Sequence, residues 1–105
     1  MSDAPHYHRA LPADEIAPDS SVAIDIMGQP ILICRSRDLY FAVANRCSHA
    51  DEELKCGLVR RGWVACPMHG ARFDLATGNP INPPATNPIA TYPVRVQDGW
   101  VEVEL

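Results

Sequence analysis

Long apolar runs are missing from this chain of 105 residues. The most apolar stretches are short, such as Ile31-Leu32-Ile33-Cys34, whereas a membrane-spanning helix needs roughly 20 apolar residues. The first residues, Met1 to His6, are polar and contain no apolar segment of the kind that signal peptides carry. These absences predict a single cytoplasmic domain over residues 1–105 with no membrane partner.

Positive charge is also scarce. Nine Lys and Arg residues stand against thirteen Asp and Glu residues, so the formal net charge is −4. This balance argues against nucleic acid and anionic membranes as partners. An acidic chain instead suits a basic docking surface on another protein, and we expect the chain itself to be a monomer.

The four cysteines need an explanation, because disulfides rarely persist in a reducing compartment. Metal binding is the usual alternative. Cys34 lies in an apolar strand and is expected to be an ordinary core residue. Cys56, just before Gly57, is expected to be a buried small residue, with an exposed thiol as the alternative. Cys47 and Cys66 are left as candidate ligands.

Helices are expected to be short. Five prolines interrupt the last third of the chain, which excludes long helices there. A helical turn is expected only near Asp14–Ala17 or Asp51–Leu54.

Short strands should dominate, because apolar alternation and turn signals recur along the chain. Asp98-Gly99 supplies the positive φ angles of a tight hairpin turn between the last two strands. Turn signals at this density predict an all-β, antiparallel sandwich or barrel-like fold. The expected strands are Tyr7–Leu11, Ser21–Ile26, Gln29–Arg35, Leu39–Ala44, Leu58–Arg60, Trp63–Ala65, Arg72–Asp74, Thr91–Val96 and Trp100–Leu105.

Two segments each combine a cysteine with a histidine. The first contains Cys47 and His49, the second contains Cys66 and His69, and sixteen residues separate His49 from Cys66. Each segment therefore offers one thiolate and one imidazole to a single metal centre. A structural Cys2His2 zinc site is the main alternative, although zinc knuckles usually place two cysteines in one loop.

These motifs, the following run Gly70–Gly78 and the segment Asn82-Pro83-Pro84 resemble the Rieske-type [2Fe–2S] ferredoxins of bacterial aromatic-ring-hydroxylating dioxygenase systems. The resemblance implies a Rieske fold, with a sandwich or barrel base and a small cluster-binding subdomain at about residues 45–75. We assign the strand Leu39–Ala44 and the three strands within the segment Leu58–Asp74 to this subdomain.

The resemblance also implies one [2Fe–2S] cluster. Cys47 and Cys66 would hold its buried iron, and His49 and His69 its outer iron. Pro83 and Pro84 would belong to a loop that covers the cluster on a third side.

The function implied is one-electron transfer from a flavin-dependent, NAD(P)H-oxidising ferredoxin reductase to a terminal oxygenase, without catalysis by this chain. The chain supplies no 2-His-1-carboxylate iron site and has no room for a domain to house one. The alternatives are the Rieske-like small subunit of an assimilatory nitrite reductase, and a redox sensor, for which no residue argues.

Neighbouring residues predict which kind of centre this is. The cytochrome bc-type relatives carry two further cysteines, and the matching positions here are Glu52 and Met68. Those relatives also place serine and tyrosine hydroxyls where they donate hydrogen bonds to the cluster and cysteine sulfurs. The matching positions here are Ala71 and Phe73, which have no hydroxyl, so the reduced cluster is less stabilised. We therefore expect a reduction potential near the low end of the Rieske range, about −150 mV.

Overall fold

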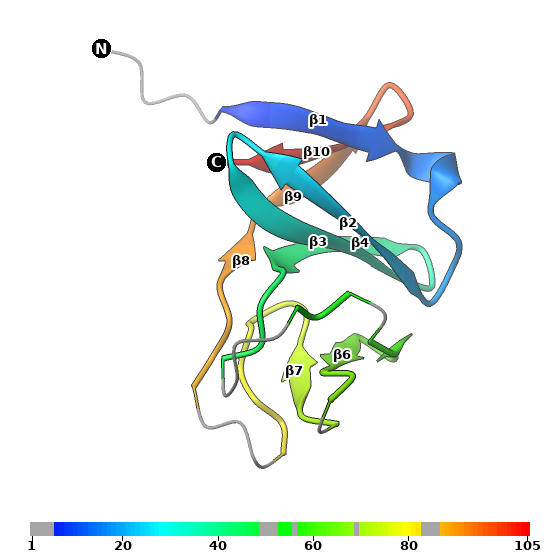
Figure 1. Ribbon diagram of the computed structural model, residues 1–105. Helices are drawn as coiled ribbons and strands as arrows, with labels where there is room; N and C mark the ends of the chain where they lie inside the picture. Colours follow the sequence, from blue (N-terminus) through cyan, green and yellow to red (C-terminus); the bar gives the residue numbers. More distant parts are fainter. Residues whose placement is uncertain (1–5, 49–52, 56, 69, 83–86) are drawn as a thin grey trace.

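The computed structural model describes residues 6–48, 53–55, 57–68, 70–82 and 87–105. In these residues the chain forms ten strands in three antiparallel sheets, with one short 3-10 helix, η1 (Ala13–Glu15) (Figure 1). No helix in this part of the chain is long and apolar enough to cross a membrane. The strands are β1 (Tyr7–Pro12), β2 (Ser20–Ile26), β3 (Gln29–Ser36), β4 (Leu39–Ala44), β5 (Val59–Arg60), β6 (Trp63–Ala65), β7 (Arg72–Asp74), β8 (Thr91–Tyr92), β9 (Val94–Gln97) and β10 (Trp100–Glu104).

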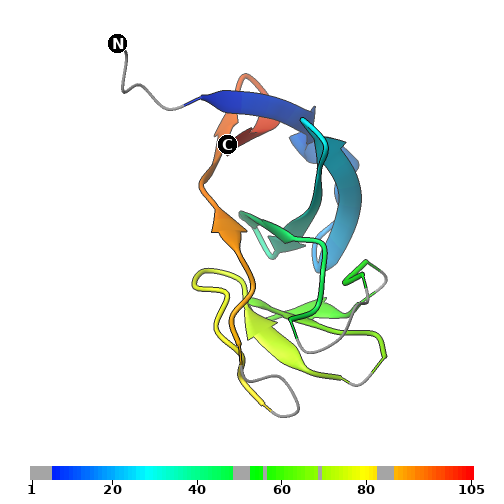
Figure 2. The ribbon, with the colours of Figure 1, turned by 60° about the vertical axis from the view of Figure 1, so that its left-hand side comes forward.

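The three sheets lie one after another along the molecule. The first has the order β1-β10-β9, the second β2-β3-β4-β8, and the third β5-β6-β7. Figures 1 and 2 show the β5–β7 sheet at one end, the β1-β10-β9 sheet at the other, and the four-stranded sheet between them. Tyr7 pairs with Glu104, so the two ends of the folded chain lie side by side, away from the β5–β7 sheet. The prediction of an all-β antiparallel fold is confirmed.

Strand β3 is buried on both faces. Ile31, Leu32, Ile33 and Cys34 are all fully buried, and alternate side chains enter two different cores. This explains why the segment is a continuous apolar run rather than an alternating one. The base core contains Leu11, Ile16, Ile26, Ile31, Ile33, Ala42, Val101 and Val103. The loop-side core contains Leu32, Cys34, Val43, Cys47, Leu54, Val59, Val64, Cys66, Ala71, Phe73, Leu75 and Ile89.

The grouping of Leu39–Ala44 with the cluster-binding strands is wrong. This segment is β4, and all six of its residues pair with β3 in the four-stranded sheet. The reason is local: only Arg37 and Asp38 separate β3 from β4, so the two strands form a hairpin. The β5-β6-β7 sheet forms without β4.

The expected single strand Thr91–Val96 is two strands. Proline has no N–H to donate to a ladder, and Pro93 separates β8 from β9. β8 pairs with β4, whereas β9 pairs with β10, so this segment connects two sheets. The turn that follows is as expected, with φ of 54° at Asp98 and 78° at Gly99.

The expected helical turn near Asp14–Ala17 is η1, which begins one residue earlier. In the second candidate, Asp51–Leu54, residues 53 and 54 are not helical and the first two lie outside the described residues.

A row of three charged residues crosses the outer face of the terminal sheet. Glu102 on the central strand β10 lies opposite Arg9 on one side and Arg95 on the other. Arg95 Nε donates to Glu102 Oε1 at 2.7 Å, and Arg9 Nε lies 3.5 Å from Oε2. Arg9 also stacks on Trp100, and Arg95 stacks on Tyr7. Glu102, with an arginine on each side, is 7% exposed although alternation predicts an open position.

The Arg95 hydrogen bond, with help from Arg9, holds the pKa of the Glu102 carboxyl below its ordinary value of 4.5. Glu102 therefore stabilises the fold above that value, and its contribution is lost as the pH falls through the lowered pKa. We expect Glu102→Gln to lower the unfolding midpoint of the holoprotein in urea at about pH 7, and to lower it less at about pH 3. A difference that stays the same at both pH values would contradict this assignment.

Candidate metal centre

Two of the four predicted ligands fall in the described residues, and both enter the same core. Cys66 follows directly after β6, and Cys47 lies three residues beyond the end of β4. Their exposures are 1% and 2%, and both belong to the loop-side core. His49 and His69 lie outside the described residues. The described residues alone contain no group of three potential metal ligands.

The loop that begins at Cys66 closes on itself. The Cys66 N–H donates to the Ala71 carbonyl at 2.7 Å, and the Gly70 N–H donates to the Cys66 carbonyl at 2.9 Å. The cysteine is therefore held at the base of the loop. Met68, 57% exposed, projects from it. This geometry gives one loop a buried thiol at its root and an exposed tip.

Asn45 fixes both ends of the other ligand loop. Its N–H donates to the Pro30 carbonyl at 3.1 Å, where the chain leaves β4. Its side-chain Oδ1 accepts from the N–H groups of Leu54 and Lys55, both at 3.0 Å, where the chain returns. Asn45 is 6% exposed, so water competes poorly for these bonds.

The proline-containing segment is attached to both ligand loops. Asn82 Oδ1 accepts from the Arg72 N–H at 2.7 Å, just after the Cys66 loop. At the other end, Ser48 Oγ donates to the Asn87 carbonyl, which connects the segment to the Cys47 loop. Pro83 and Pro84 lie outside the described residues. The described residues on either side of them, Asn82 and Asn87, bond to residues next to the two cysteine loops.

The loop-side core contains cysteines in two kinds of position in the fold. Cys34 lies in the middle of β3, and burial raises the pKa of its thiol to about 12, so it is a neutral core residue as predicted. Cys47 and Cys66 instead lie in loops beyond strand ends. The prediction for Cys56 falls outside the described residues.

The donor set fits an iron–sulfur centre. Two thiolates placed in an apolar core are costly unless a cationic centre binds them. The sequence places His49 two residues after Cys47, and His69 three residues after Cys66. Thiolate and imidazole donors are the ligands that iron–sulfur clusters of mixed ligation use. Next to Cys66, Ala71 and Phe73 are fully buried and carry no hydroxyl.

Sequence reasoning missed the residues that position the loops. Asn45, Ser48 and Asn82 are not metal ligands, but their side chains join segments that are distant in the sequence. Short polar side chains next to a ligand loop are the signal that would have pointed to them, because Asn and Ser readily bond to backbone groups.

The chain matches the sequence profile of the Rieske [2Fe–2S] domain over residues 6–93. It is 37% identical over 99 residues to the anthranilate 1,2-dioxygenase ferredoxin subunit of Burkholderia cepacia, covering 94% of this chain and 92% of that protein.

Solved structures of dioxygenase ferredoxins are also similar to this chain. The ferredoxin of carbazole 1,9a-dioxygenase from Nocardioides aromaticivorans IC177 superposes with a TM-score of 0.86 at 32% identity, over 92% of this chain and 95% of that one. A chain from a complex of reduced oxygenase and oxidised ferredoxin in carbazole 1,9a-dioxygenase gives 0.88 at 27% identity, over 93% and 92%. A chain named for the small subunit of an NADH-dependent nitrite reductase from Mycobacterium tuberculosis gives 0.85 at 23% identity, over 98% and 97%, which shows a common fold alone.

Replacing Asn45 tests its role in holding the Cys47 loop. Asn45→Ala leaves the N–H groups of Leu54 and Lys55 without an acceptor, so we expect a loss of about 2 kcal/mol in the free energy of unfolding. Amide hydrogen exchange at these two residues should accelerate. Asn45→Asp keeps the accepting oxygen and serves as the control, with protection close to wild type. Equal protection in all three proteins would show that Asn45 does not hold the loop.

Proposed function

We propose that this chain, which belongs to the Rieske [2Fe–2S] domain family, carries single electrons between two proteins. The donor is a flavin-dependent, NAD(P)H-oxidising ferredoxin reductase, and the acceptor is a terminal aromatic-ring-hydroxylating oxygenase. The family carries one Rieske-type [2Fe–2S] cluster. The relatives are named ferredoxin subunits, so the chain is an electron-transfer component and not a catalytic enzyme. The observation that supports the proposal most is similarity to a dioxygenase ferredoxin subunit over nearly the full length of both chains.

We assign Cys47 and Cys66 to the buried iron, and His49 and His69 to the outer iron. The burial of both cysteines in the loop-side core supports the first half of this assignment. Bound there, the cluster supplies a one-electron acceptor, neutral with its two thiolates when oxidised and singly negative when reduced, so it takes up its electron more readily than an all-cysteine cluster. The protein's part is to hold the two thiolates in a dry core.

The oxygenase is the proposed acceptor because a related ferredoxin chain has been solved in a complex with an oxygenase. Met68 supplies an exposed apolar contact at the tip of the Cys66 loop, a type of residue that protein interfaces favour. The reductase is the proposed donor, with the chain acting as a monomer in the cytoplasm, where a thiol such as Cys34 stays reduced. The nitrite reductase alternative has only the common fold in its favour.

Reconstitution tests the carrier function and the ligands together. With NADH, the reductase and the oxygenase encoded in the same genome, wild-type holoprotein should support hydroxylation of an aromatic substrate. Cys66→Ala should lose its visible absorption and about two irons per chain, and the hydroxylation should stop. Cys34→Ala removes a thiol from the same loop-side core and should keep both iron and activity. A colourless wild-type protein with stoichiometric zinc would refute the cluster assignment, and coloured protein that neither partner reduces or oxidises would refute the carrier function.

The reduction potential should lie near −150 mV, at the low end for Rieske centres, because Ala71 and Phe73 offer no hydroxyl to the sulfurs. Ala71→Ser should raise the potential by adding a buried hydroxyl beside the Cys66 loop. Ala76→Ser makes the same change at an exposed position after β7 and should leave it unchanged. Protein-film voltammetry on the three holoproteins measures this, and a wild-type potential well above zero would refute the prediction.

A further inference from the structure

Three exposed arginines gather where the four-stranded sheet meets the β5–β7 sheet. Arg37 and Arg61 line a surface hollow of about 540 Å³ together with Leu39 and Phe41. The same two arginines, with Arg60, line a neighbouring hollow of about 370 Å³. We call Arg37, Arg60 and Arg61 the arginine patch. In a chain of net charge −4, it concentrates a third of the Lys and Arg residues at one place.

The fold holds the two turns of the patch together. Arg37 lies in the turn between β3 and β4, and Arg61 lies in the turn between β5 and β6. The Gly62 N–H donates to Ser36 Oγ at 2.8 Å, and Ser36 is 5% exposed. Both arginines have left-handed backbone, with φ of 58° at Arg37 and 47° at Arg61. Glycine or asparagine would adopt this conformation at less cost, so folding does not favour arginine at these tips.

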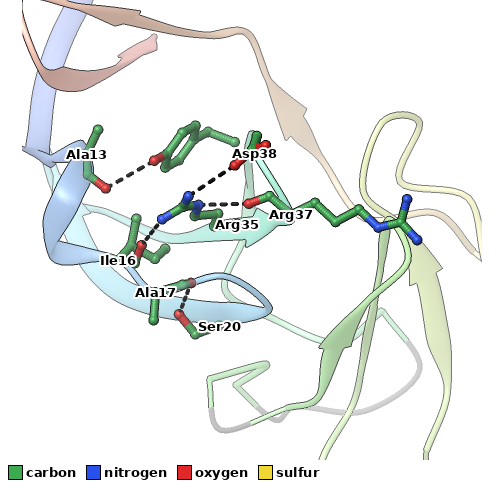
Figure 3. Close-up of polar contacts among 8 residues, drawn as sticks. Ala13, Ile16, Ala17, Ser20, Arg35, Arg37 and Asp38 are labelled. Atoms are coloured by element: carbon green, nitrogen blue, oxygen red, sulfur yellow. Dashed lines mark hydrogen bonds and ion pairs between the residues drawn. The ribbon is translucent and has the colours of Figure 1, made fainter.

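Within the described ranges, the patch arginines differ from the other cations in having no carboxylate or aromatic ring as a partner. Arg35 illustrates the contrast: it donates to the carbonyls of Ile16 and Arg37 and to Asp38, whereas the Arg37 side chain extends away from this network (Figure 3). Among the described residues, no carboxylate lies within 4.0 Å of the three patch guanidiniums and no aromatic ring stacks on them. Carboxylates or rings engage Arg9, Arg35, Lys55, Arg72 and Arg95.

The surroundings of the patch have the composition of a docking surface. Leu39 and Leu58 line the two hollows and are 64% and 48% exposed. Arginine beside exposed apolar side chains is enriched where proteins bind one another. Two acidic groups face the patch: Asp19 lines the smaller hollow, and Asp38 is paired with Arg35. The patch therefore keeps an excess of positive charge.

We propose that the arginine patch docks a carboxylate-bearing surface of a redox partner protein, with Leu39 and Leu58 packing against apolar side chains of that surface. That the partner is a redox protein rests on the proposed function, whereas its acidic chemistry rests on the arginine patch alone. The three residues of β6 lie between Gly62 and Cys66, and these four residue steps correspond to about 13 Å at the rise of a strand. A standard interface of about 800 Å² per partner is roughly 30 Å across, so one partner covers both the patch and the cysteine loops.

The test compares two double variants of the holoprotein with the same change in net charge. Arg60→Gln/Arg61→Gln removes two charges from the patch, and Val96→Glu/Gln97→Glu adds two negative charges at exposed positions of β9. Stopped-flow kinetics measure the second-order rate constants for reduction by the reductase and for oxidation by the oxygenase. We expect the patch variant to slow at least one of them about fivefold at low salt, with the difference disappearing at about 0.5 M salt. The control variant should not reproduce this loss.

The electron paramagnetic resonance spectrum and the potential should be the same in all three proteins, because about 13 Å of strand separates the patch from Cys66. Equal rates for the two variants with both partners would overturn the docking proposal and leave the carrier function standing.

A second measurement tests the arginine patch without a redox partner. It applies also if the wild-type protein exchanges electrons with neither the reductase nor the oxygenase. Oxidised, ¹⁵N-labelled holoprotein is titrated with a hexaglutamate peptide and followed by NMR. We expect salt-sensitive shifts at the amides of Leu58 and Gly62, and their loss in Arg60→Gln/Arg61→Gln. Unshifted amides in wild-type protein would overturn the patch as an acidic docking surface.

Discussion

Strand β3 must satisfy two hydrophobic cores at once, and most of the molecule is arranged around that requirement. Ile31 and Ile33 face the base core, while Leu32 and Cys34 face the loop-side core that contains Cys47 and Cys66. Because interiors are close-packed, the two cysteines rest against a strand whose position is fixed from its other face. Asn45, Ser48, Asn82 and the closure at Cys66 supply the described hydrogen bonds that join the loops to the rest of the fold. A rigid site of this kind is suited to electron transfer, in which ligand positions change little.

Two groups of arginines differ in the side chains that surround them. On the terminal sheet, Arg9 and Arg95 enclose Glu102, and the resulting row shields a buried carboxylate from an otherwise costly environment. At the junction of the other two sheets, the arginine patch has no such carboxylate among the described residues. Charge is thus neutralised within the fold at the base and left available near the cysteine loops. A net acidic chain can in this way present a locally basic surface to one partner.

Local signals made much of the fold predictable, and long-range pairing explains what was missed. Apolar alternation and turn residues are properties of neighbouring positions, so the bounds of most strands and the Asp98-Gly99 turn followed from the sequence. The division at Pro93 and the placement of β4 depend on which distant strand each segment meets. Burial of Glu102 likewise depends on cross-strand neighbours that no local pattern contains. For the candidate site, the two motifs predicted that Cys47 and Cys66 serve one centre, and both lie in one core, whereas the roles of all four proposed ligands stay predictions.

The pairing of β1 with β10 has a practical consequence for how the molecule can be attached to a surface. Since Tyr7 and Glu104 are neighbours at the end away from the β5–β7 sheet, a tether at either terminus holds the protein by the same end. The cysteine loops and the junction of the sheets then face the solution. An array of molecules immobilised through terminal tags would therefore be uniformly oriented, with the described parts of the cysteine loops at the end away from the support.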